Sequence, residues 1–286
     1  MKGGYINLAR SVERRQAMHA QLQRLGLHWV HRVEAVDAQT LRPAPAAPVS
    51  AGERACFLSH AQAIAAADPQ DFLLVLEDDL VLSDALPAVL RNEAMGQLAR
   101  YDIVFLECQP YTSTANLLAL WTALQRRLPG GTGARANISG VDILEAAGLY
   151  NWGATAYLVT PRGLRLIPGL LREALDAGPA DPFDITLNRL IHAQRLHAAV
   201  LLPFLATAQL GGHARTTIAD RPQAQANEVL GSALRRLFFA GPIDGTEAFA
   251  AAYRHAPLTD DPQLRLLADL MAQLFVITAT GGAERR

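Results

Sequence analysis

Apolar runs of strand length alternate with longer amphipathic stretches along the first two thirds of the chain. The runs predict strands at 3–8, 28–33, 72–76, 101–107, 151–160 and 197–202, and the stretches predict helices at 11–25, 52–67, 84–98, 162–174 and 185–194. This alternation is typical of an α/β fold in which helices cover both faces of a mostly parallel sheet. Beyond residue 222 the pattern is helical, at 227–239, 246–254 and 262–279, so we expect one α/β domain over 1–222 and a helical C-terminal extension over 223–286.

Two connecting segments interrupt the alternation. Residues 41–48 are rich in Pro and Ala, which excludes regular structure there. Residues 108–150 contain one expected helix, at 115–128, and a glycine-rich stretch at 129–133. Because connections this long in compact domains are usually functional or disordered, we expect 108–150 to include a loop that can close over a bound ligand.

The apolar run at 72–76 ends in three consecutive acids, Glu77, Asp78 and Asp79. Adjacent carboxylates repel each other, so they need solvent, a cation or hydrogen-bond donors. Side chains alternate along an extended chain, so we expect Glu77 and Asp79 on one side and Asp78 on the other. Such a pair of oxygen ligands suits Mg²⁺ or Mn²⁺, which complete their shells with water and substrate phosphates. By itself, the segment fits a polar turn that stops a strand equally well.

Polar residues near other predicted elements are further candidates. Asn7, Arg10 and Arg14 follow the first strand, at the carboxyl end where open α/β sheets bind ligands, although Arg14 also fits a solvated helix face. His60 is polar among apolar neighbours and shares a helix face with Cys56, four residues earlier. Two metal ligands can be spaced in this way, but without a second pair, packing is the favoured interpretation for Cys56.

Asp184 precedes the predicted helix at 185–194, where backbone donors and the helix dipole give an aspartate an ordinary capping role. Its position after the sheet also suits a general base. Trp152 beside Gly153 offers an apolar ring beside a close backbone approach, and a core tryptophan is an equally good interpretation.

Composition narrows the classes of function. The net charge of −1 over 286 residues provides no basic field for nucleic acid. The two cysteines, Cys56 and Cys108, make no disulfide framework, so a reducing compartment is the default. We find neither a signal-peptide core nor an apolar run long enough to span a membrane. We therefore expect a cytoplasmic protein, with peripheral contact at the inner face of the membrane left open.

Several segments, in order along the chain, together resemble glycosyltransferase family 25, which includes bacterial lipooligosaccharide galactosyltransferases and collagen-modifying domains. The two most specific are S-A-G-E-R-A-C-F-L-S-H at 50–60 and L-E-D-D at 76–79. The others are I-N-L-A-R-S with E-R-R at 6–15, the segments 153–159 and 182–184, and Gln209 with 216–218. The resemblance spans roughly residues 5 to 218.

The resemblance implies a fold of the GT-A type and an inverting transfer of a hexose, such as galactose, from a UDP-sugar to a saccharide acceptor in lipopolysaccharide, lipooligosaccharide or other cell-surface glycan synthesis. It implies Mn²⁺ or Mg²⁺ held by Asp79 with Glu77, and Asp184 as the base, with Asp181 in reserve. The nucleotide-sugar site it implies consists of Asn7, Leu8, Arg10, Arg14, His60, Glu77, Asp78, Gly153 and Gln209.

One departure from the family pattern supports an alternative. Ala9 stands where the family usually has Asp, which removes a carboxylate from the nucleotide site. A catalytically inactive nucleotide-sugar-binding protein of the same fold is therefore the second hypothesis. A third, an unrelated phosphotransferase that uses the same acids for Mg²⁺, is disfavoured by the missing Walker-type glycine loop.

Overall fold

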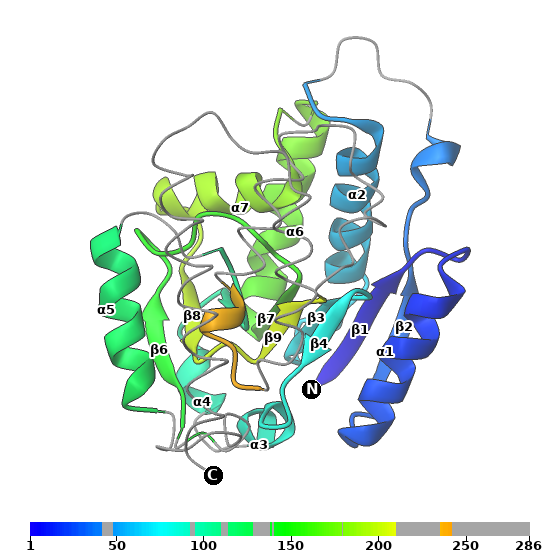
Figure 1. The fold of residues 1–286 in the computed structure, drawn as a ribbon. Helices are drawn as coiled ribbons and strands as arrows, with labels where there is room; N and C mark the ends of the chain where they lie inside the picture. Colours follow the sequence, from blue (N-terminus) through cyan, green and yellow to red (C-terminus); the bar gives the residue numbers. More distant parts are fainter. Residues whose placement is uncertain are drawn as a thin grey trace, which may run out of the picture.

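The structure is a computed structural model that describes residues 1–41, 48–91, 95–109, 114–127, 138, 140–178, 180–209 and 235–241. Its centre is a seven-stranded sheet in the order β2-β1-β3-β7-β5-β8-β6 (Figure 1). The strands are β1 (Lys2–Asn7), β2 (Val30–Glu34), β3 (Leu73–Glu77), β5 (Ile103–Phe105), β6 (Asp142–Glu145), β7 (Ala156–Val159) and β8 (Ala198–Leu202). The α/β class predicted from the sequence is confirmed.

The sheet is mixed: β1, β2, β3, β5 and β8 run in one direction, as a mostly parallel sheet requires, and β6 and β7 run against them. β1 runs parallel to β2 and β3, and β5 runs parallel to β8. β7 is antiparallel to both of its neighbours, β3 and β5, and β6 is antiparallel to β8. An apolar run reports that a strand is buried on both faces and carries no information about its direction, which is why the sequence did not reveal the inserted β7.

Helices cover both faces of this sheet, and each face has its own apolar core. One core includes side chains of α2 (Ala51–Ala65), α5 (Thr114–Gln125), α6 (Pro161–Asp176) and α7 (Phe183–His192). The other includes side chains of α1 (Val12–Arg24), α3 (Leu86–Arg91) and α4 (Met95–Leu98). The middle strands, β3, β7 and β5, therefore contribute side chains to both cores.

Local sequence signals account for several helix boundaries. Ser50 and Glu53 form the predicted capping box at the start of α2, and Pro161 occupies the first turn of α6. Gly26, which follows α1, has a φ of 68°, a conformation that suits glycine after a helix. Within the single helix predicted at 84–98, the described residues are helical in α3 and α4, and 92–94 lie outside the described ranges.

A second, two-stranded sheet was not predicted. β4 (Leu80–Leu82) follows directly after the acids that end β3, and it pairs antiparallel with β9 (Ala206–Ala208). This pairing brings the chain after β8 back to the acidic segment. Three-residue strands leave too little periodicity to be recognised in a sequence.

Several predictions concern residues outside the described ranges. These are the irregular segment over 42–47, the glycine-rich stretch at 129–133, the 216–218 motif, the domain boundary at 222 and most of the helical extension. Among the described residues, no helix has the length and apolar character needed to span a membrane.

Candidate functional site

The acids Glu77, Asp78 and Asp79, here called the carboxylate turn, end β3 between β1 and β7. The register places Glu77 opposite Ile6, so the turn lies beside Asn7, the last residue of β1. The sequence prediction had placed polar residues of the first and third strands at one edge of the sheet, and the structure brings them together there.

On the side of α1, hydrogen bonds and an ion pair hold Asp78. Its Oδ2 accepts a hydrogen bond from Asn7 Nδ2 at 2.5 Å, and its Oδ1 lies 3.2 Å from Arg14 Nη1. Asn7 is itself buried and fixed by Arg32, whose Nε donates to Asn7 Oδ1 at 2.9 Å. Burial raises the pKa of Asp78, and the hydrogen bond from Asn7 and the charge of Arg14 oppose that rise. Asp78 thus ties the end of β3 to β1 and α1.

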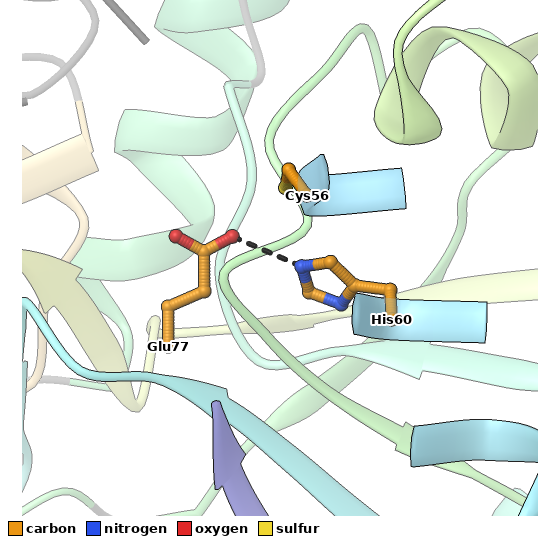
Figure 2. Close-up of side chains that lie close together, drawn as sticks. All are labelled: Cys56, His60 and Glu77. Atoms are coloured by element: carbon orange, nitrogen blue, oxygen red, sulfur yellow. Dashed lines mark hydrogen bonds and ion pairs between the residues drawn. The ribbon is translucent and has the colours of Figure 1, made fainter. Parts of the chain in front are cut away.

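On the side of α2, Glu77 faces a histidine (Figure 2). His60 Nε2 lies 3.1 Å from Glu77 Oε1, and His60 Nδ1 lies 2.8 Å from the hydroxyl oxygen of Tyr157. The His60 ring, which is 1% exposed, stacks on Phe183 with 4.4 Å between the ring centroids. Glu77 and Asp78 therefore face opposite sides of the sheet, as the alternation of side chains predicted.

Cys56 lies close to the same pair, one turn before His60 on α2. Its sulfur, a nitrogen of His60 and a carboxylate oxygen of Glu77 all lie within 4.8 Å of one another. Burial and the charge of Glu77 raise the pKa of the Cys56 thiol well above its usual range. Packing was the favoured interpretation for Cys56 because no second pair of ligands was evident, and the structure places one further donor, Glu77, beside Cys56 and His60.

Asp79 is the third acid of the carboxylate turn and contacts the same arginine as Asp78. Its Oδ2 lies 3.2 Å from Arg14 Nη1, which it shares with Asp78, because the chain turns after Glu77 and no longer alternates. Burial and the charge of Glu77 raise the pKa of Asp79 to about 7, although Arg14 opposes the shift. With 32% of the side chain exposed, this carboxylate is recessed but open to solvent, as a metal ligand that also meets a substrate must be.

Asp184 lies in the first turn of α7, and Pro182, not Asp184, occupies the capping position. The Asp184 carboxylate accepts two backbone hydrogen bonds, from Gly153 N at 3.1 Å and from Ile185 N at 2.9 Å. Gly153 has a φ of 90°, which glycine adopts readily. Burial, with a smaller contribution from Glu77, raises the pKa of Asp184. A fixed carboxyl with a raised pKa is a candidate proton acceptor.

The remaining predicted residues differ in how close they come to the carboxylate turn. The backbone of Gln209 donates to the carbonyl oxygen of Asp79 at 3.0 Å, which places Gln209 beside the turn. Leu8 is half-buried directly after β1. Arg10, in contrast, forms its ion pair with the partly exposed Asp37. The reserve base Asp181 is paired with Arg189 at 2.7 Å.

The sequence analysis missed a buried ion pair beside the site. Glu107, just beyond β5, is 0% exposed, and both of its oxygens lie near Arg235 Nη1, at 3.2 and 3.1 Å. Thr155 donates a further hydrogen bond to Glu107, and the Arg235 guanidinium lies 5.9 Å from the centre of the Trp152 ring. A charged residue at the end of a predicted buried strand was the available signal for Glu107, but the sequence could not identify its partner.

Comparison with known proteins agrees with the sequence motifs. A family model described as Glycosyltransferase family 25 (LPS biosynthesis protein) matches residues 4–174. The matched region begins in β1, ends in α6 and includes the carboxylate turn, whereas Asp184 and Gln209 lie beyond it. A search of curated proteins found no match for the chain.

Proposed function

Because the chain belongs to glycosyltransferase family 25 (LPS biosynthesis protein), we propose that it transfers a hexose from a UDP-sugar to a saccharide hydroxyl. The proposed donor is a sugar nucleotide such as UDP-galactose, and the transfer inverts the anomeric configuration. The acceptor is a lipopolysaccharide, a lipooligosaccharide or another cell-surface glycan. One observation carries the proposal. Asp79 lies just beyond a central strand, beside Glu77 and 3.2 Å from Arg14, and burial and the charge of Glu77 raise its pKa to about 7.

The chemical problem in this transfer is the leaving nucleoside diphosphate, which accumulates negative charge. The donor set fits a hard divalent cation, Mn²⁺ or Mg²⁺, because Asp79 offers recessed carboxylate oxygens next to those of Glu77. Such a cation would neutralise the diphosphate and orient the donor. Arg14 lies against Asp78 and Asp79, which supports a role for its guanidinium at the same phosphates.

The acceptor hydroxyl must lose a proton when it attacks the anomeric carbon. Asp184 is the best-supported base because two backbone donors fix its carboxylate and its pKa is raised toward the working range of a base. The proton passes from the acceptor oxygen to a carboxylate oxygen of Asp184 as the new glycosidic bond forms. The ion pair with Arg189 makes Asp181 a weaker choice.

The test is a panel of UDP-sugars, assayed for turnover with Mn²⁺ or with a chelator, in the presence of lipooligosaccharide acceptors. We expect metal-dependent turnover that Asp79→Asn reduces to background. Asp84→Asn, which alters an exposed acid paired with Arg24, is the matched control and should leave turnover unchanged. Full turnover in Asp79→Asn would exclude the proposed cation site.

Asp184→Asn tests the base separately. General-base assistance typically contributes about 10² to 10⁴ in rate, so we expect kcat to fall by about that factor while the KM for the donor changes little. A variant that binds the donor weakly and keeps its kcat would assign Asp184 to binding.

Ala9 favours the second candidate, a nucleotide-sugar-binding protein without activity. Ala9 is exposed immediately after β1, where the family usually has a carboxylate. Calorimetric binding of UDP in the presence of Mn²⁺, combined with no turnover of any donor and no hydrolysis of UDP-sugars, would support this candidate over the enzyme.

A further inference from the structure

Cys56, His60 and Glu77 form a thiol–imidazole–carboxylate cluster that the transfer reaction does not use as a unit. Figure 2 shows Cys56 and His60 on successive turns of α2, both facing the carboxylate of Glu77 at the end of β3. One donor atom from each residue lies within 4.8 Å of the other two. The cluster thus joins two elements that are distant in the sequence.

The donor types in this cluster differ from those around Asp79. A thiolate and an imidazole are the ligands that Zn²⁺ and similar thiophilic cations prefer, whereas Mg²⁺ and Mn²⁺ prefer oxygen. Bond lengths of about 2.0 to 2.3 Å place tetrahedral zinc ligands roughly 3.5 Å apart. The 3.1 Å between His60 Nε2 and Glu77 Oε1 is already close to that spacing, and the 4.8 Å limit leaves only a small side-chain adjustment for Cys56.

The surroundings of His60 are those of a supported metal ligand. The second ring nitrogen of a ligating histidine usually makes a hydrogen bond that fixes the ring and its tautomer. Here Nδ1 lies 2.8 Å from the Tyr157 hydroxyl oxygen, which can accept a hydrogen bond from it, and Phe183 stacks on the ring. The orientation of His60 is therefore set by groups other than the two possible fellow ligands.

We propose that Cys56 Sγ, His60 Nε2 and Glu77 Oε1 bind a thiophilic divalent cation of the Zn²⁺ class, with water or a substrate oxygen as the fourth ligand. Binding releases the thiol proton of Cys56 to solvent as the sulfur–metal bond forms. His60 Nε2 then carries no proton, and Nδ1 donates to Tyr157. The cation links α2 to the end of β3 and fixes the Glu77 carboxylate beside Asp79.

Glu77 has two carboxylate oxygens, so this site and a hard cation at Asp79 are not mutually exclusive. Glu77 also borders the hard-cation site of the proposed transfer, but binding of a metal to Cys56, His60 and Glu77 can be measured without turnover. The test of this site can therefore use the metal alone.

Co²⁺ is the probe, because a cobalt–thiolate bond produces an intense charge-transfer absorption that oxygen ligands do not. We expect the whole protein to bind one equivalent of Co²⁺ with this band and to lose the band when one equivalent of Zn²⁺ is added. The chain has two cysteines, which provides a matched pair of variants: Cys56→Ala should abolish the band and Cys108→Ala should keep it.

Two further variants separate this site from the others. Tyr157→Phe should weaken Zn²⁺ binding by about 10- to 100-fold, since it removes the hydrogen bond to Nδ1. Asp79→Asn should keep the thiolate band, so loss of turnover in that variant and loss of the band report on different sites. The absence of a cobalt–thiolate band in the wild-type protein, or its persistence in Cys56→Ala, would overturn the proposal.

Discussion

The strands β3 and β5 lie on either side of β7, and each is followed by acidic residues. The surroundings of these two sets of acids differ. At the end of β5, Glu107 is fully buried and held by Arg235 and Thr155. At the end of β3, Asp79 shares the single Arg14 contact with Asp78, stays partly exposed and has a pKa of about 7. An acid with a buried counterion is costly to separate from it, whereas a partly exposed acid with a raised pKa is a candidate for binding a cation or a ligand.

The contrast also shows that acidic residues in similar sequence positions can have different roles in the structure. Glu107 and the carboxylate turn both follow buried apolar strands, and from the sequence they differ only in number of acids. The structure distinguishes them by what lies opposite: a buried guanidinium faces Glu107, and the imidazole of His60 faces Glu77. The following variants test this distinction, from the largest expected change in stability to the smallest.

Glu107→Gln should have the largest effect. It leaves the Arg235 charge buried at 5% exposure without its carboxylate, and removing one member of a buried ion pair typically costs about 3–5 kcal/mol. The free energy of unfolding, measured by urea denaturation with a chelator present, should fall by that amount. The double variant Glu107→Gln with Arg235→Met should recover part of the loss.

Glu173→Gln is the matched control for that variant. Glu173 also pairs with an arginine, Arg195, but both side chains are at least half exposed, so we expect a change within about 0.5 kcal/mol. Equal effects at Glu107 and Glu173 would contradict the structural role assigned to the buried pair.

Asp78→Asn should have an intermediate effect. The substitution removes one acceptor from the contacts with Asn7 and Arg14, and leaving such donors unsatisfied typically costs about 1–3 kcal/mol. Urea denaturation alongside Asp84→Asn, an exposed acid, provides the comparison. If Asp78→Asn and Asp84→Asn have the same free energy of unfolding, the contacts of Asp78 with Asn7 and Arg14 do not stabilise the fold.

Titration of Asp79 should have the smallest effect on the free energy of unfolding, and this effect should appear as a dependence on pH. Its pKa is raised from 3.8 to about 7, so between these values the folded state keeps a proton that the unfolded state has released. The free energy of unfolding should therefore fall as pH rises through this window and level off above pH 7. The change should be on the order of 1 kcal/mol, after allowance for the exposed part of the side chain.

Urea denaturation at pH 5 and pH 8, with a chelator present, measures this dependence. Asp79→Asn lacks the titrating group, so its stability should change less between the two pH values than that of the wild-type protein. If the stability of the wild-type protein changes over this interval no more than that of Asp79→Asn, the pKa of Asp79 is not raised in the folded state.

Much of the fold could be predicted because local signals encode it. The Ser50–Glu53 capping box, the buried run before Glu77 and the apolar stretch of α6 each depend on neighbouring residues, and each was confirmed. The direction of β7 and the pairing of β4 with β9 depend on contacts between distant segments. A single sequence does not record such contacts, so neither the direction of β7 nor the pairing of β4 with β9 was predicted.

The candidate site shows the same difference between features that local sequence encodes and contacts between distant segments. The acids at 77–79, Asn7, His60 and Asp184 were identified from local sequence, and the structure gathers Asn7 and His60 around those acids. The ion-pair partners of the arginines could not be predicted from the sequence. Arg14 pairs with Asp78 and Asp79, whereas Arg10 pairs with Asp37. Both arginines read alike in the sequence, because the partner of a long flexible side chain depends on tertiary packing.

The Glu107–Arg235 contact also constrains the order of events during synthesis, since its two residues are 128 positions apart. A nascent chain that has left the ribosome only as far as β9 already contains every strand of both sheets, but it lacks the guanidinium that neutralises Glu107. The centre of this protein therefore cannot reach its final charge balance until Arg235 has emerged from the ribosome.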